Sequence, residues 1–137
     1  MRFYIATGFS NSRKAELLSE VLIKRGHEHT LDRTRRSGAA DVTDYSEYAF
    51  NELRAVRDSE LVIALLPGGS ETHTELGVAI ATRSNKRVIL WSETGAEFDP
   101  VNDPCAYYFH SCVERIACPF DELLLRLDKE QIGSDLK

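Results

Sequence analysis

A glycine-rich segment at residues 67–77 carries the side chains best suited to chemistry. Gly68 and Gly69 let the backbone come close to a ligand, and Ser70 and Thr72 offer hydroxyl groups. The segment leads into an expected helix, whose first N–H groups would point at the same ligand. These features predict a binding site for an anion or a sugar.

Glu75 lies in what the spacing predicts to be the first turn of a helix over residues 72–83. The helix dipole and the free amides at such a position favour the ionised carboxylate. A carboxylate that stays charged beside a ligand can act as a nucleophile toward an electrophilic sugar carbon. An acidic residue that only complements the helix dipole would look the same, and position alone leaves both interpretations open.

The elements that must position these residues follow from the periodicity of the apolar side chains. Strands are predicted at residues 2–7, 27–31, 61–66 and 87–91, with a fifth at either 107–109 or 113–116. Helices are predicted at residues 13–25, 46–58 and 72–83, and a last one is expected from Pro119 through Leu127. Residues 32–44 show little periodicity and are expected to form a long loop, either a lid or an interface.

Strict alternation of strands and helices in 137 residues predicts a doubly wound α/β fold. We expect a single domain over residues 1–137, a flavodoxin-like or Rossmann-like three-layer sandwich with a roughly five-stranded parallel sheet. In such folds ligands bind beyond the carboxyl ends of the strands, where the strand order reverses. The loops at residues 8–12 and 67–74 are therefore the expected walls of the site.

The composition disfavours several classes of partner. The chain has 17 basic and 22 acidic residues and a net charge of −5, which argues against binding to nucleic-acid polymers. No apolar run approaches the roughly 20 residues that cross a bilayer, and no signal peptide is visible, so we expect a cytoplasmic protein without a membrane partner. The three cysteines include no Cys-x-x-Cys pair, which favours reduced thiols over disulfides or a zinc site. No metal or cofactor is expected.

One basic cluster stands out against the acidic background, and it lies in the expected long loop. Its members are Arg33, Arg35 and Arg36, with no aromatic residues between them to stack on bases. The cluster is either a solvated stretch of loop or a contact to a small anionic ligand.

Three segments, taken in order, resemble the nucleoside 2-deoxyribosyltransferase family, which includes the 2'-deoxynucleoside 5'-monophosphate N-glycosidases. They are the opening F-Y-I-A-T-G at residues 3–8, the acids Glu52 and Glu60 before an apolar strand, and the glycine-rich loop leading into T-x-x-E-L-G at residues 72–77. The same loop also resembles the P-G-G-x-G-T-x-x-E signature of the cytokinin-activating phosphoribohydrolases. Both resemblances imply an enzyme that cleaves the N-glycosidic bond of a (deoxy)nucleoside or its 5'-monophosphate, by hydrolysis or by transfer to another base. The first also implies a homodimer.

The resemblance implies three catalytic residues. Glu75 would attack the anomeric carbon, Tyr4 would orient Glu75 by a hydrogen bond, and Glu52 would assist the leaving base. Such a pair of carboxylates suits a reaction that passes through an oxocarbenium-like transition state. From the residues alone, Tyr4 is equally typical of a core aromatic and Glu52 of a solvated acid.

The expected substrate-binding residues come from the two loops and are Gly8, Ser10, Ser12, Arg13, Gly68, Gly69, Ser70 and Thr72. Of these, Ser10, Ser12 and Arg13 are candidates to hold a 5'-phosphate. Glu71 stands where both families have glycine, and its charge argues against a phosphorylated substrate. A non-catalytic nucleotide-binding or sensor module that uses the same crevice is the alternative function.

Overall fold

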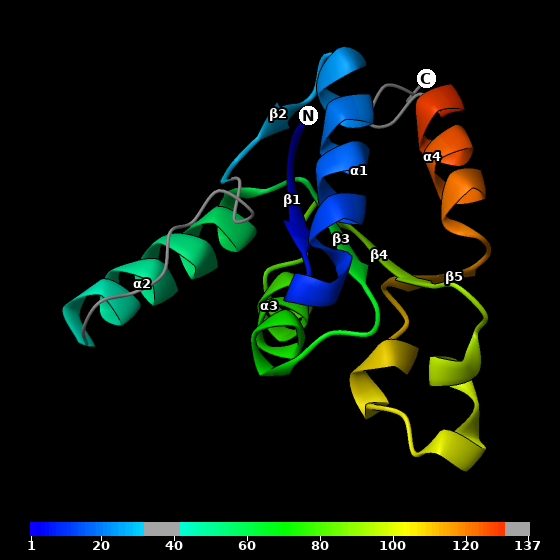
Figure 1. The fold of residues 1–137 in the computed structure, drawn as a ribbon. Helices are drawn as coiled ribbons and strands as arrows, with labels where there is room; N and C mark the ends of the chain where they lie inside the picture. Colours follow the sequence, from blue (N-terminus) through cyan, green and yellow to red (C-terminus); the bar gives the residue numbers. More distant parts are fainter. Residues whose placement is uncertain (32–41, 131–137) are drawn as a thin grey trace.

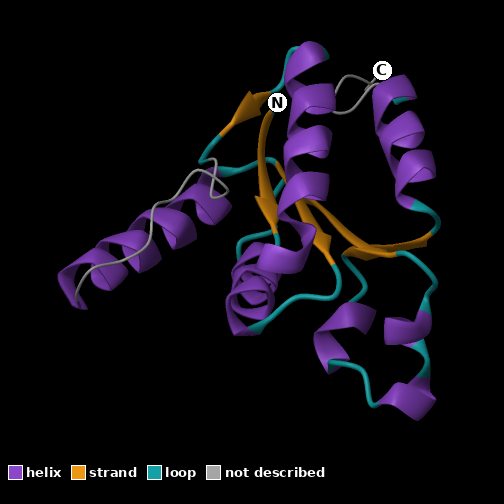
Figure 2. Cartoon of the chain, viewed as in Figure 1, coloured by secondary structure: helices purple, strands orange, loops and turns teal. Residues whose placement is uncertain are grey.

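A parallel sheet of five strands forms the centre of the molecule (Figures 1 and 2). The computed structural model describes residues 1–31 and 42–130. The strands are β1 (Arg2–Ala6), β2 (Glu28–His29), β3 (Leu61–Leu65), β4 (Arg87–Ser92) and β5 (Val113–Ala117). The helices are α1 (Ser12–Lys24), α2 (Val42–Asp58), α3 (Ser70–Ala81) and α4 (Phe120–Lys129), with short 3₁₀ turns η1 (Phe9–Asn11), η3 (Ala96–Phe98), η4 (Pro100–Asn102) and η5 (Ala106–Phe109).

The strand order is β2-β1-β3-β4-β5, and every neighbouring pair is parallel. This is the flavodoxin-like order, in which the chain reverses direction across the sheet between β1 and β3. Tyr4 lies opposite Val62 and Ala6 opposite Ala64, so these two strands end side by side. The predicted doubly wound α/β fold is confirmed, and the reversal places the two expected loops together.

Alternate residues of β1, β3 and β4 supply two separate cores, as a sheet covered on both faces requires. Phe3 and Ile5 of β1 pack on the face covered by α1 and α4. Tyr4 and Ala6 pack on the opposite face, against α2 and α3. Figure 1 shows α1 and α4 side by side on their face of the sheet. Tyr4 is therefore part of the core on the α3 side, from which its hydroxyl reaches the candidate site.

The structure decides between the two candidates for the fifth strand and corrects two predicted helix boundaries. The fifth strand is the second of the two candidates. All of the first candidate lies in η5, where Tyr108 packs edge-on against Phe98. α2 begins at Val42, so residues 42–44 are helical rather than loop; residues 32–41, including the arginine cluster, lie outside the described residues. α3 begins at Ser70, because Gly69 takes an extended conformation as the N-cap. Glu75 consequently lies in the second turn of α3, not the first.

Only the C-terminal half of α2 is buried against the body of the protein, through Glu52, Ala55 and Val56. Its N-terminal half extends away from the sheet (Figure 1). The ammonium group of Lys86 fixes the C-terminal end by donating hydrogen bonds to the carbonyls of Val56 at 2.7 Å and Arg57 at 3.0 Å. Burial lowers the pKa of Lys86 from its ordinary value. These contacts hold the part of α2 that carries Glu52.

Candidate active site

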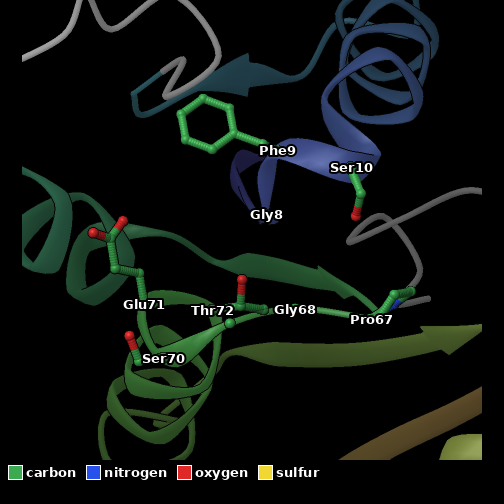
Figure 3. Close-up of a pocket in the computed structure, with 9 residues that line it drawn as sticks. Gly8, Phe9, Ser10, Pro67, Gly68, Ser70, Glu71 and Thr72 are labelled. Atoms are coloured by element: carbon green, nitrogen blue, oxygen red, sulfur yellow. The ribbon is translucent and has the colours of Figure 1, made fainter.

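A cleft of about 380 Å³ opens at the carboxyl ends of β1 and β3. Figure 3 shows the loop after β1 on one side of it and the start of α3 on the other. Its lining includes six of the eight expected binding residues, namely Gly8, Ser10, Gly68, Gly69, Ser70 and Thr72, together with Phe9, Pro67 and Glu71. Ser12 and Arg13 do not line it. The guanidinium of Arg13 is paired with Glu16 at 3.0 Å on the surface of α1.

Asn11 ties together the two loops that wall this cleft. Its side chain is 4% exposed, and the amide nitrogen donates hydrogen bonds to the carbonyl of Pro67 at 3.2 Å and more weakly to that of Leu65 at 3.5 Å. Sequence reasoning missed this residue. The only available signal was a polar residue in the turn after the first strand, and its partners are backbone atoms more than fifty positions away.

Gly68 packs directly against Thr72 at the base of the cleft. A methyl group added at Gly68 would lie 2.6 Å from Cβ of Thr72, closer than such atoms approach one another. The Thr72 side chain is 2% exposed, and its hydroxyl has no hydrogen-bond partner in the described part of the chain. Because Gly68 has no side chain, its backbone can lie close to Thr72 at the start of α3 without overlapping it.

A smaller cavity of about 160 Å³ lies between α2 and α3 and contains the expected catalytic acids. It is lined by Tyr45, Tyr48, Ala49, Glu52, Leu53, Ser70, Glu71, Thr74 and Glu75. Ser70 and Glu71 also line the first cleft, so the two spaces adjoin at the first turn of α3. The tyrosines of α2 were not anticipated, because the apolar face of that helix gave no sign of a cavity beside it.

The structure brings Tyr4, Glu52 and Glu75 together from three different elements. The hydroxyl of Tyr4 donates a hydrogen bond to Oε2 of Glu75 over 2.7 Å. Tyr4 is 0% exposed, Glu75 2% and Glu52 6%, so neither acid is a solvated surface residue. A buried carboxylate held by a tyrosine, with a second acid on the same cavity, is suited to attack a carbon that develops positive charge.

His73 faces away from both spaces. Its Nδ1 donates to the carbonyl of Gly69 at 2.7 Å, which leaves Nε2 to accept from the Tyr108 hydroxyl at 2.6 Å. Burial raises the pKa of Tyr108 above its ordinary value, in keeping with a protonated, donating hydroxyl. The His73 ring thus links the glycine-rich loop at Gly69 to Tyr108 of η5.

Comparison with solved structures shows which proteins share this arrangement of elements. Clostridium botulinum CMP N-glycosidase, BcmB, matches with a TM-score of 0.67 and 23% identity, covering 93% of this chain and 98% of that chain. A 2-deoxyribosyltransferase from Bacillus psychrosaccharolyticus matches with a TM-score of 0.66 and 15% identity, covering 97% and 94%. The chain has their fold. A conserved protein from Enterococcus faecalis V583 matches with a TM-score of 0.56 and 17% identity, covering 91% and 95%.

No family model and no curated protein matches the chain. Among residues 1–31 and 42–130, no helix is both long and apolar enough to cross a bilayer. Within the same residues, no three His, Cys, Asp or Glu side chains are grouped so that they could hold a metal ion.

Proposed function

We propose that the protein cleaves the N-glycosidic bond of a (deoxy)nucleoside or its 5'-monophosphate, with Glu75 as the nucleophile. The observation that carries this proposal is the buried hydrogen bond from Tyr4 to Glu75, in a cavity that Glu52 shares. The fold adds support, because two solved structures of that fold are named as an N-glycosidase and a deoxyribosyltransferase.

In the first step a carboxylate oxygen of Glu75 bonds to the anomeric carbon while the bond from that carbon to the base nitrogen breaks. The base leaves with the bonding electron pair and gains a proton, which Glu52 supplies or helps to deliver. Tyr4 keeps the Glu75 carboxylate in one orientation throughout. The product of this step is a glycosyl ester on Glu75 and a free base.

In the second step a water molecule attacks the anomeric carbon of the ester and gives up a proton to Glu52, which lost one to the base in the first step, or to solvent. The bond to Glu75 breaks. The carboxylate is regenerated and the free sugar leaves. A second nucleobase in place of water would give transfer instead of hydrolysis. Both outcomes need the same Glu75 intermediate.

The proposal is tested by incubating the purified protein with the four 2'-deoxynucleosides, the four ribonucleosides and their 5'-monophosphates, with and without a second base. Free base and exchanged nucleoside are followed by chromatography. Base release from at least one substrate is expected. If no substrate yields free base, and calorimetry shows saturable nucleotide binding, the protein is a binding or sensor module and the proposed activity is wrong.

Replacing Tyr4 with phenylalanine is expected to lower kcat by roughly 10- to 100-fold, because a hydrogen bond to a charged group contributes about 1.5–3 kcal/mol. The ring is retained, so the core around it should remain packed. Any fall in melting temperature should come from the hydrogen-bond donor that the buried Glu75 carboxylate loses. Steady-state kinetics of base release provide the measurement. An unchanged kcat would show that Tyr4 does not orient Glu75 for the reaction, and a rise in KM alone would assign it to substrate binding.

We further propose that two copies of the chain pair through α2. Val42, Tyr45 and Phe50 are exposed large apolar side chains on this helix. The acids Asp44 and Glu47 lie toward its N-terminus and Arg54 and Arg57 toward its C-terminus, so an antiparallel copy would match opposite charges.

Analytical ultracentrifugation tests this pairing. The wild type is expected to sediment as a dimer, and the double substitution V42E/F50E as a monomer. Ile23→Glu, which places the same charge at an exposed apolar position on α1, serves as the control and should remain dimeric. A monomeric wild type at micromolar concentration would refute the pairing.

A further inference from the structure

The carbonyl group of Gly69 accepts two hydrogen bonds from the same residue. The backbone N–H of His73 donates the ordinary helical bond at 3.2 Å, and Nδ1 of the His73 ring donates a second one at 2.7 Å. A carbonyl oxygen has two lone pairs and can accept both bonds. Because the carbonyl can only accept, Nδ1 must carry a proton. The Gly69 carbonyl is thus held by both the backbone and the side chain of His73.

This double contact fixes the peptide group that opens α3. Gly69 is the N-cap of the helix, with a φ of −95° and a ψ of −158°, and the backbone of a glycine is freer to rotate than that of other residues. The peptide bond from Gly69 to Ser70 is planar, so its C=O and its N–H point in opposite directions. Holding the carbonyl toward His73 therefore directs the Ser70 N–H out of the N-terminus of α3, where the cleft lies.

Tyr108 fixes the His73 ring in turn. Its hydroxyl donates to Nε2 of His73 over 2.6 Å, and the two rings stack with their centroids 5.6 Å apart. Tyr108 is 6% exposed, and its ring packs edge-on against Phe98. Because Nε2 accepts this bond, the proton of the neutral ring stays on Nδ1, which is the state that the Gly69 carbonyl requires. A chain of hydrogen bonds consequently runs from η5 through His73 to the glycine-rich loop.

Neither His73 nor Tyr108 borders the cleft or the cavity that holds Glu75. Both line a separate open space beside η3, η4 and η5. Gly69 and Ser70, at the other end of the chain of hydrogen bonds, do line the cleft. An effect of the pair on a bound substrate would therefore pass through the peptide group between Gly69 and Ser70.

We propose that His73 and Tyr108 are positioning residues of the active site. They hold the peptide group that opens α3 so that the Ser70 N–H binds an oxygen of the substrate, either of its sugar or of its 5'-phosphate. This inference rests on the proposed function and deepens it, since it assigns a role to side chains outside the site itself. An N–H that is already oriented need not be ordered when the substrate binds, so the pair tightens binding without touching the carboxylates.

Steady-state kinetics of base release from a nucleoside and from its 5'-monophosphate test this role in three variants. His73→Leu removes the donor to Gly69 and is expected to raise KM by roughly three- to tenfold, the effect of one lost hydrogen bond, with kcat within about twofold of the wild type. Tyr108→Phe should raise KM by a smaller factor, because the ring proton is no longer confined to Nδ1. The Nδ2 group of asparagine takes the place of Nδ1, so His73→Asn should bring KM back close to the wild-type value.

Tyr107→Phe is the matched control, because it removes the same hydroxyl group from the neighbouring residue. Tyr107 is 60% exposed and lines neither the cleft nor the cavity, so KM should not change. A rise in KM for both substrates assigns the bound oxygen to the sugar, and a rise for the monophosphate alone assigns it to the phosphate. An unchanged KM in His73→Leu overturns the inference while leaving the proposed function intact. So does a His73→Asn protein that behaves like His73→Leu.

Nitrogen-15 NMR of the imidazole rings, at a pH of about 8.5, tests the chain of hydrogen bonds without any assay of activity. The His73 signals, assigned by their loss in His73→Asn, should show the proton on Nδ1 in the wild type and shared between both nitrogens in Tyr108→Phe. A proton on Nε2 in the wild type overturns the inference. If the wild type releases no base at all, the proposed function fails, and calorimetric titration of the same two ligands replaces the kinetics. An equal Kd for the wild type and His73→Leu, or binding of neither ligand, then refutes the positioning role.

Discussion

Replacing Glu75 with glutamine is expected to lower the rate of base release by about a thousandfold or more, because the amide cannot form the glycosyl ester. The substitution keeps the size of the side chain, and an amide oxygen can still accept the hydrogen bond from Tyr4. The core around α3 should therefore remain intact. Chromatographic assay of free base over long incubations, with the active enzyme as reference, gives the loss in rate.

Two further measurements separate loss of chemistry from loss of structure. Glu122→Gln removes an exposed acid on α4 that lines neither space, and it should retain full activity. Intact-mass analysis of an acid-quenched reaction should show a sugar adduct on the wild type that is missing from Glu75→Gln. A Glu75→Gln protein that keeps more than a tenth of the wild-type rate would rule out Glu75 as the nucleophile.

The fold could be predicted from the sequence because its main signals are local. The continuous apolar run at residues 61–66 is typical of a strand covered on both faces, and residues 61–65 form the central strand β3. The glycine-rich segment that follows it indicated the position of the cleft, since doubly wound sheets bind ligands at that edge. The first residues of α2 and α3 were predicted less accurately than the strands. The start of α3 at Ser70 depends on the extended conformation of Gly69, which many residue types would permit.

The contacts that shape the site could be predicted only in part, because they join residues far apart in the chain. The hydrogen bond between Tyr4 and Glu75 spans 71 positions. It is expected from the family resemblance, whereas the pattern of residues alone gives no sign of which partner a strand tyrosine will have. Asn11 is similar, since it binds carbonyl groups of a loop after another strand. The sequence shows Glu71 as an unusual charge in the glycine-rich loop. Only the three-dimensional arrangement shows that it lines both the cleft and the smaller cavity.

Replacing Gly68 with alanine is expected to destabilise the protein by about 1–3 kcal/mol, the usual cost of forcing a methyl group into packed structure. The new Cβ would lie 2.6 Å from both Cβ and Cγ2 of Thr72. Cβ of Thr72 is fixed to the backbone of α3, so no side-chain rotation can relieve that overlap. The loop or the first turn of α3 must move, which should also slow base release. Urea unfolding followed by circular dichroism measures the change in stability.

Gly69→Ala is the matched control, because it makes the same chemical change at the next residue. A Cβ at Gly69 meets no atom within 4 Å, and the residue has a negative φ of −95°. Alanine restricts the unfolded chain, which stabilises by about 0.4–1 kcal/mol, and it is a poorer N-cap by a similar amount. The two effects should nearly cancel. If Gly68→Ala is no less stable than Gly69→Ala, the close packing of Gly68 on Thr72 does not exist in solution.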